Sequence, residues 1–177
     1  MRRRLALSKV YGFIEPGPVV LVSTCRRGVP NLMPMSWHRM VEFEPPQIAC
    51  VLSDRNDSYD TIRATRECVM AIPSVEIAEQ VVACGNWSGR DVDKFAAFGL
   101  TPLKAATVRA PLVAECHVNL ECRLLDGGAD PRYGILVREV QQAWLDRSRK
   151  NPRTIHHLGT GNFMVAGRRM HVASRMR

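Results

Sequence analysis

The segment 116–124 constrains the fold of this chain more than any other, because its apolar and polar residues alternate strictly. Successive side chains of a β-strand point to opposite faces of the sheet, so strict alternation predicts a half-buried strand. Such strands are typical of antiparallel sheets with one solvated face. The predicted core face carries Cys116, Val118, Leu120, Cys122 and Leu124, and the opposite face carries His117, Asn119, Glu121 and Arg123.

Other segments predict more strands of the same kind. We expect a hairpin formed by strands at 19–25 and 31–37, with Pro34 at an edge or a bulge because proline has no N–H to donate. Further strands are expected at 47–52, 68–72 and 133–145, with a turn at 126–131 before the last one. Strands in hairpin order predict a mainly β fold, a small and largely antiparallel barrel.

A few short helices interrupt these strands. They are expected at about 58–66, 75–82 and 92–98, with Ser74 and Asp91 as caps of the last two. The sequence after Lys150 has the composition of a loop.

The length of 177 residues indicates one domain, 1–177, with a core large enough to need no staples. The longest apolar stretches fall far short of a membrane span, which needs about 18–20 residues. The start of the chain resembles a signal peptide, but Ser8 and Lys9 interrupt the apolar region, so we expect a cytoplasmic protein. The six cysteines form no C-x-x-C pair, which favours buried free thiols over a metal site.

The net charge of +8 comes from the C-terminal segment 147–177, which has basic residues and no acidic ones. Such a segment can bind nucleic acid, or it can be solvated or line a pocket for an anionic ligand. The absence of a nucleic-acid motif, and of aromatic residues other than Phe163, favours the solvated or pocket-lining interpretation.

The polar run 53–61 follows an apolar strand and leads into a helix. Free N–H groups at a helix start, together with the positive end of its dipole, make a phosphate site. The alternative is a self-satisfied capping box, with Asp57 as the N-cap and Asp60 three residues later.

Several common catalytic motifs are absent. The run Gly159-Thr160-Gly161 is followed by Met164 where a dinucleotide-binding motif needs its third glycine. There is no Walker loop and no nucleophile elbow, which disfavours a Rossmann enzyme, a P-loop NTPase and an α/β-hydrolase. His156 and His157 are weak catalytic candidates without the context of a metal site.

Short motifs in a consistent order cover residues 15–167. They are 18–24 (PVVLVST), 34–37 (PMSW), 45–51 (PPQIACV), 88–95 (SGRDVDKF), 99–102 (GLTP), 111–122 (PLVAECHVNLEC) and, more loosely, 157–159 with Phe163. As a set they resemble the flavin reductase-like, FMN-binding split-barrel family. The resemblance implies an antiparallel, Greek-key-like split barrel that forms a homodimer, with one non-covalent FMN per subunit near the dimer interface.

The resemblance also implies which residues meet the flavin. Residues near the ring are Met35, Ser36 and Trp37; those near the phosphate are Ser53, Arg55, Asn56 and Ser58; those near the flavin or its substrate are Asn86, Trp87, Ser88 and Arg90, with Lys94 adding charge. The helix start departs from the family pattern. Relatives commonly place a basic residue, Asp and then Thr there, whereas this chain has Asn56, Asp57 and Ser58.

The leading functional hypothesis is an oxidoreductase that passes hydride from NAD(P)H to bound FMN and then to an acceptor. Flavin carries the difficult chemistry, so no catalytic triad is required. The basic segment, with His156 or His157, is a candidate position for the dinucleotide's phosphates. A flavoredoxin-like electron carrier with a protein partner is the second hypothesis, and a cofactor-free, nucleic-acid-associated barrel is the third.

Overall fold

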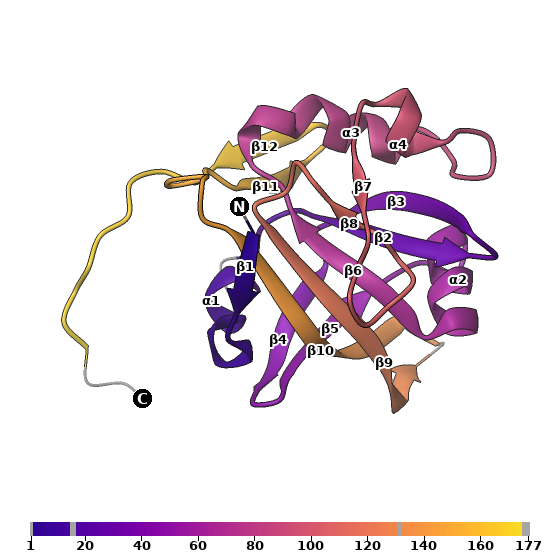
Figure 1. Cartoon of the computed structure of the whole chain (residues 1–177), viewed down its shortest axis with the longest axis horizontal. Coiled ribbons are helices and arrows are strands. Elements are labelled where there is room, and N and C mark those ends of the chain that lie inside the picture. Colours follow the sequence, from indigo (N-terminus) through magenta and orange to yellow (C-terminus); the bar gives the residue numbers. More distant parts are fainter. Residues whose placement is uncertain (1, 15–16, 131, 175–177) are drawn as a thin grey trace.

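The computed structural model describes residues 2–14, 17–130 and 132–174, and its backbone forms an antiparallel barrel with short helices outside it (Figure 1). The barrel strands pair in the order β3-β2-β6-β9-β10-β5-β4, and β1 pairs with β10. Their bounds are β1 Arg2–Leu5, β2 Val20–Arg26, β3 Val29–Met35, β4 His38–Phe43, β5 Pro46–Val51, β6 Glu67–Ile72, β9 Val118–Asp130 and β10 Ile135–Asp146. The predicted mainly β, antiparallel barrel is confirmed.

The remaining elements lie around this barrel. Figure 1 shows α3 and α4 across one end of it, close to the small hairpin of β11 and β12, while α2 lies at its side. Their bounds are η1 Leu7–Lys9, α1 Tyr11–Ile14, α2 Asp57–Thr65, η2 Val75–Ile77, α3 Ala78–Asn86, α4 Lys94–Ala97, β7 Pro102–Leu103, β8 Leu112–Val113, β11 Ile155–Gly159 and β12 Asn162–Val165. None of the helices that the structure describes is long and apolar enough to cross a bilayer.

The strands β3 and β4 are the two ends of the pairing order, although they are consecutive in the chain. Pro34 therefore lies on an edge strand, as predicted, where a missing N–H costs no ladder bond. The hairpin between β2 and β3 turns at Arg27 and Gly28, both with positive φ (53° and 82°), as its two-residue turn requires. Residues 36 and 37 connect β3 to β4 and so cross from one open edge of the sheet to the other.

Two hydrophobic cores share the strands. Val20 and Val22 of β2 pack inside the barrel, whereas Leu21 packs against the layer that contains Val81 of α3 and Phe95 of α4. Both faces of the central strands are therefore covered.

This second core corrects the prediction for segment 116–124. His117, Asn119 and Glu121 are buried, although alternation predicted a solvated face. Asn119 donates to Val113 O and accepts from Val113 N, at 3.1 and 2.8 Å. Asn119 and Glu121 are tolerated there because β8 and the loop 104–111 before it, which cover this face, supply partners for them.

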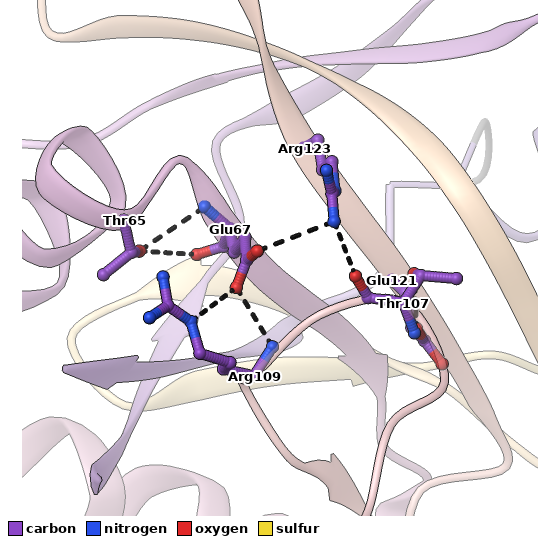
Figure 2. A network of polar contacts seen from close by, with 6 residues as sticks. All are labelled: Thr65, Glu67, Thr107, Arg109, Glu121 and Arg123. Carbon is purple, nitrogen blue, oxygen red and sulfur yellow. Dashed lines mark hydrogen bonds and ion pairs between the residues drawn. The ribbon is translucent and has the colours of Figure 1, made fainter. Parts of the chain in front are cut away.

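Glu121 and Glu67 attach that loop to the outside of the barrel (Figure 2). Glu121 accepts from the backbone N–H of Ala106 and Thr107, at 2.9 and 2.5 Å, and from Trp144 Nε1 at 2.7 Å. These bonds lower the pKa of Glu121, although burial opposes them and is the largest single effect. Figure 2 shows Glu67 between Arg109 of the loop and Arg123 of β9.

Several boundary predictions were wrong. The expected turn at 126–131 is instead the end of β9, which runs to Asp130, and the turn follows at 132–134; Pro131 lies outside the described residues. The expected loop after Lys150 contains the β11–β12 hairpin. Strands β1 and β4 were not predicted, because neither shows a clear alternation.

Two cap predictions were also wrong. Helix α2 begins at Asp57 itself, and its N-cap is Asn56, whose side chain makes no capping bond. Helix α4 is capped by Asp93 instead of Asp91, because Asp93 accepts from the backbone N–H of Phe95 and Ala96.

Candidate functional site

The connection between β3 and β4 places polar and aromatic groups at the open seam of the barrel. Trp37 is 70% exposed, although its carbonyl accepts from Val51 N at 3.0 Å. His38 is buried and its Nε2 lies 2.7 Å from Pro18 O. The backbone is thus fixed on both sides while the Trp37 ring projects outward.

A hollow of about 360 Å³ lies beside this connection. Its walls come from β3, α3 and the β11–β12 hairpin and are mostly apolar, with a few polar groups. The lining residues are Val19, Pro34, Met35, Ser36, Trp37, Val81, Val82, Asn86, His157, Gly161 and Phe163. Of the residues predicted to meet a flavin, Met35, Ser36, Trp37 and Asn86 line this hollow. We call it the seam hollow.

Helix α2 follows β5, the strand whose Val51 N–H donates to the carbonyl of Trp37. Ser53 organises the turn, because its carbonyl accepts from Asn56 N at 3.1 Å and its hydroxyl accepts from Arg55 N at 3.2 Å. Among the described residues, the N-cap Asn56 makes no side-chain bond to the first turn of α2, although its carbonyl accepts from Tyr59 N at 2.9 Å, and the Arg55 side chain is exposed. Uncapped N–H groups beside an exposed guanidinium are the chemistry that binds a phosphate.

The segment 86–90 packs against this helix start. Arg90 Nε lies 3.3 Å from Asp57 Oδ1, and Ser88 Oγ accepts from Arg90 N at 3.2 Å. Gly89 lies so close to the Asn31 side chain that a Cβ there would overlap its amide. The structure therefore joins the start of α2 to the loop after α3 and to Asn31 of β3, while Asn86 at the end of α3 lines the seam hollow with the end of β3.

Not every predicted residue is accessible. Ser58 is buried, and its hydroxyl accepts from Asn31 Nδ2 at 3.4 Å. Lys94 is also buried, and its Nζ donates to Leu32 O and Cys84 O, each at 2.7 Å. Burial lowers the pKa of Lys94, while the nearby Cys84 and Asp57 raise it. Lys94 thus joins β3 to α3 beneath the site.

The two candidate histidines face different surroundings. His156 is held by Gly17 O at 3.1 Å and Thr154 Oγ1 at 3.0 Å, so both ring nitrogens have partners. His157 lines the seam hollow and packs its ring against Phe163, with centroids 5.3 Å apart.

Some residues that line the seam hollow were not predicted from the sequence. Val81 and Val82 of α3 line the seam hollow, but apolar residues in a short helix give no signal that separates a ligand wall from core. Among the described residues, no group of three His, Cys, Asp or Glu side chains is placed to hold a metal ion.

An antiparallel barrel with an open seam, a hollow beside the seam and an uncapped helix start defines the class of flavin reductase-like split barrels. A model of the flavin reductase like domain family matches residues 13–163, so the chain belongs to this family.

Individual relatives agree with this assignment. The uncharacterized protein YddH of Escherichia coli (strain K12) is 34% identical over 176 residues, which cover 89% of this chain and 90% of YddH. The FMN-binding domain of a flavin reductases-like enzyme from Shewanella baltica OS155 superposes with a TM-score of 0.91, 26% identity and 98% coverage of both chains. Flavoredoxin of Desulfovibrio vulgaris (Miyazaki F) gives a TM-score of 0.79 at 26% identity and covers 90% of this chain and 91% of its own.

Proposed function

We propose that this protein binds FMN and acts as an oxidoreductase that takes hydride from NAD(P)H. The observation that carries the proposal is the seam hollow beside residues 35–37, in a chain of the flavin reductase-like family. The similar domain from Shewanella baltica is described as FMN-binding, which supports the same cofactor here.

The residues present fit a flavin. The seam hollow has the size and the mixture of apolar walls and few polar groups that suit a planar cofactor. Met35 and Phe163 supply apolar surface, and Ser36 and Asn86 supply hydrogen-bonding groups for the polar edge of the ring. The start of α2, with Ser53 and Arg55, is the proposed phosphate position, because Arg90 contacts its first residue, Asp57, and Asn86 of the same segment lines the seam hollow.

Bound FMN supplies the capacity to accept hydride and pass on electrons. The protein's part is to hold the ring in a slot and to exclude water. Val81 and Val82 close the slot from α3, while His157 and Phe163 form the wall where a second ring can stack. No side chain in the seam hollow is needed as a nucleophile.

A homodimer is part of this proposal. Trp37, Val41 and Phe43 are more than half exposed, and all three lie on β4 or directly before it. A cluster of large apolar side chains on one strand suits contact with a second copy. In such a dimer the partner would cover the seam beside the flavin.

Anaerobic reduction tests the proposal. The purified protein is mixed with FMN and either NADH or NADPH without oxygen, and bleaching of the flavin band is followed. Reduction faster than the protein-free rate is expected with at least one nucleotide. A rate equal to the protein-free rate with both would sink the reductase proposal.

A second function is favoured by the likeness to flavoredoxin and by the basic segment 147–174. An electron carrier would bind FMN tightly, react negligibly with NAD(P)H and dock on an acidic protein partner through that segment. Deleting residues 168–177 would then weaken the docking without releasing flavin. Rapid bleaching by NADH or NADPH would count against this alternative.

A further inference from the structure

A second, larger cavity lies on the other side of β11 from the seam hollow. Its volume is about 1210 Å³, and its walls come from the N-terminal segment, the loop before β11 and the segment after β12. Neighbouring residues separate the two spaces: Val19 and His157 line the seam hollow, whereas Pro18 and His156 line this cavity. The lining residues are Lys9, Phe13, Pro18, His117, Asn151, Pro152, Arg153, Thr154, His156, Ala166, Gly167, Arg168 and Arg169. We call it the basic cavity.

The charged residues that line the basic cavity are mostly cations. Lys9, Arg153, Arg168 and Arg169 line it, and among the described lining residues there is no aspartate or glutamate, although Glu76 lies near enough to interact with Arg153 and His117. These cations come from three segments that are far apart in the sequence but meet at one space. Converging cations raise the local potential and attract an anion more strongly than scattered surface charges do.

His117 adds a polar group at the buried wall. Its side chain is 2% exposed, and its Nδ1 has no hydrogen-bond partner among the described residues. Burial, with the charges of Arg149 and Arg169, lowers the pKa of His117 to about 4, while a hydrogen bond with the Ile72 backbone and the charge of Glu76 oppose this shift. A buried ring nitrogen without a partner is unusual in a protein, so His117 Nδ1 is a group that a ligand in the cavity can satisfy.

The other part of the wall is apolar. Phe13 lies next to His117, with ring centroids 6.3 Å apart, and Pro18 and Pro152 extend this surface. Cations alone would suit inorganic phosphate. Cations beside an aromatic and two proline rings suit a ligand that has both a ring system and several negative charges.

We propose that the basic cavity binds a nucleoside diphosphate, with its phosphates at Arg153, Arg168 and Arg169 and its base against Phe13. The volume of about 1210 Å³ exceeds what a phosphate ion fills and lies above the roughly 300–1,000 Å³ of small-molecule sites, so a whole nucleotide has room there. This site is separate from the seam hollow, so the proposal does not depend on the protein binding FMN.

Calorimetric titration of the full chain with ADP, pyrophosphate and adenosine, with and without FMN, tests the proposal. We expect saturable binding of ADP, tighter than that of pyrophosphate and much tighter than that of adenosine. The double variant Arg168→Ala, Arg169→Ala removes two exposed cations of the cavity and should weaken ADP binding about 10-fold or more. The control variant Arg26→Ala, Lys104→Ala loses the same charge from residues that do not line the cavity, and it should keep the affinity.

The outcomes separate this site from the flavin site. ADP binding that leaves the visible spectrum of bound FMN unchanged supports a second site, whereas displacement of FMN by ADP overturns it. No ADP binding, or equal weakening in both double variants, also overturns the proposal. Pyrophosphate that binds as tightly as ADP contradicts the role given to Phe13. A protein that binds no FMN can still be titrated with ADP, so failure of the proposed function and failure of this proposal are distinguishable.

Discussion

Arg90 Nε lies 3.3 Å from Asp57 Oδ1, so the loop after α3 is joined to the first residue of α2. The alternative to a phosphate site was a capping box with Asp57 as the N-cap, but the Asp57 side chain contacts Arg90, and the N-cap residue, Asn56, makes no side-chain bond. The same aspartate therefore holds a cation next to the proposed phosphate position and places a negative charge there. These two effects oppose each other in FMN binding.

Substitutions at this pair measure the two effects. Arg90→Ala should weaken FMN binding about 10-fold or more, because it removes a cation beside the phosphate. Asp57→Asn should strengthen it about 2- to 10-fold, because it removes a negative charge and frees the guanidinium. Fluorescence titration with FMN measures both. Asp60→Asn, an exposed change on the same helix, is the control, and equal effects of Asp57→Asn and Asp60→Asn would contradict the role of Asp57.

Lys94 provides a second prediction, on stability. Lys94→Met leaves the carbonyls of Leu32 and Cys84 without their donor, so the free energy of unfolding should fall by about 2–4 kcal/mol. Urea denaturation measures the change. Lys104→Met, at an exposed position, should have almost no effect. A loss below about 1 kcal/mol for Lys94→Met would show that the two bonds contribute little.

The sequence predicted the barrel because the barrel depends on local patterns, and the three segments proposed for the site come from the same kind of pattern. Apolar runs between turns fixed the strands, and ordered motifs fixed residues 35–37, 53–58 and 86–90. Burial of both faces of β9 was not predictable, because it depends on a loop from elsewhere in the chain that covers Glu121. The same reason applies to Lys94, whose partners are carbonyls on two other elements.

The grouping of residues at the basic cavity also could not be predicted from the sequence. The sequence shows that segment 147–177 is basic, but it does not show which other residues lie beside this segment in the folded protein. Lys9 and His117 join Arg153 and Arg169 because the N-terminal segment and β9 pack beside the loop before β11. Such a grouping follows from the tertiary fold and leaves no spacing signal in the sequence.

Arg138 in the barrel interior gives a third prediction. It is fully buried, it donates to Cys68 Sγ at 2.9 Å and to Cys50 Sγ, and its Nε has no partner among the described residues. Burial lowers the pKa of Arg138 to about 10, so the guanidinium stays charged near neutral pH with thiols as partners. Replacing a buried charge by an apolar side chain of similar length is often neutral or stabilising.

Arg138→Met should therefore preserve or raise the free energy of unfolding, by up to about 4 kcal/mol. Cys68→Ala should lower it by about 2–4 kcal/mol, because it removes an acceptor and leaves a cavity. Cys25→Ala, at a half-buried position away from Arg138, is the matched control. A large loss of stability in Arg138→Met would show that the guanidinium is better paired than its contacts indicate.

The last prediction concerns the dependence of stability on pH. Burial lowers the pKa of His117 from 6.5 to about 4, so the folded protein keeps the ring neutral where the unfolded chain protonates it. Between these values the unfolded state binds more protons, so stability rises with pH and falls as the pH drops from about 6.5 to about 4. The contribution is no more than about 3 kcal/mol. Burial also lowers the pKa of His38, which acts in the same direction, whereas Asp146, with a pKa of about 2, acts at lower pH.

His117→Gln should therefore lose less stability than the unchanged protein between pH 7 and 5 in urea denaturation. His171→Gln, in the exposed C-terminal segment, should behave like the unchanged protein. Identical pH profiles for the His117 variant and the unchanged protein would contradict a neutral, buried His117.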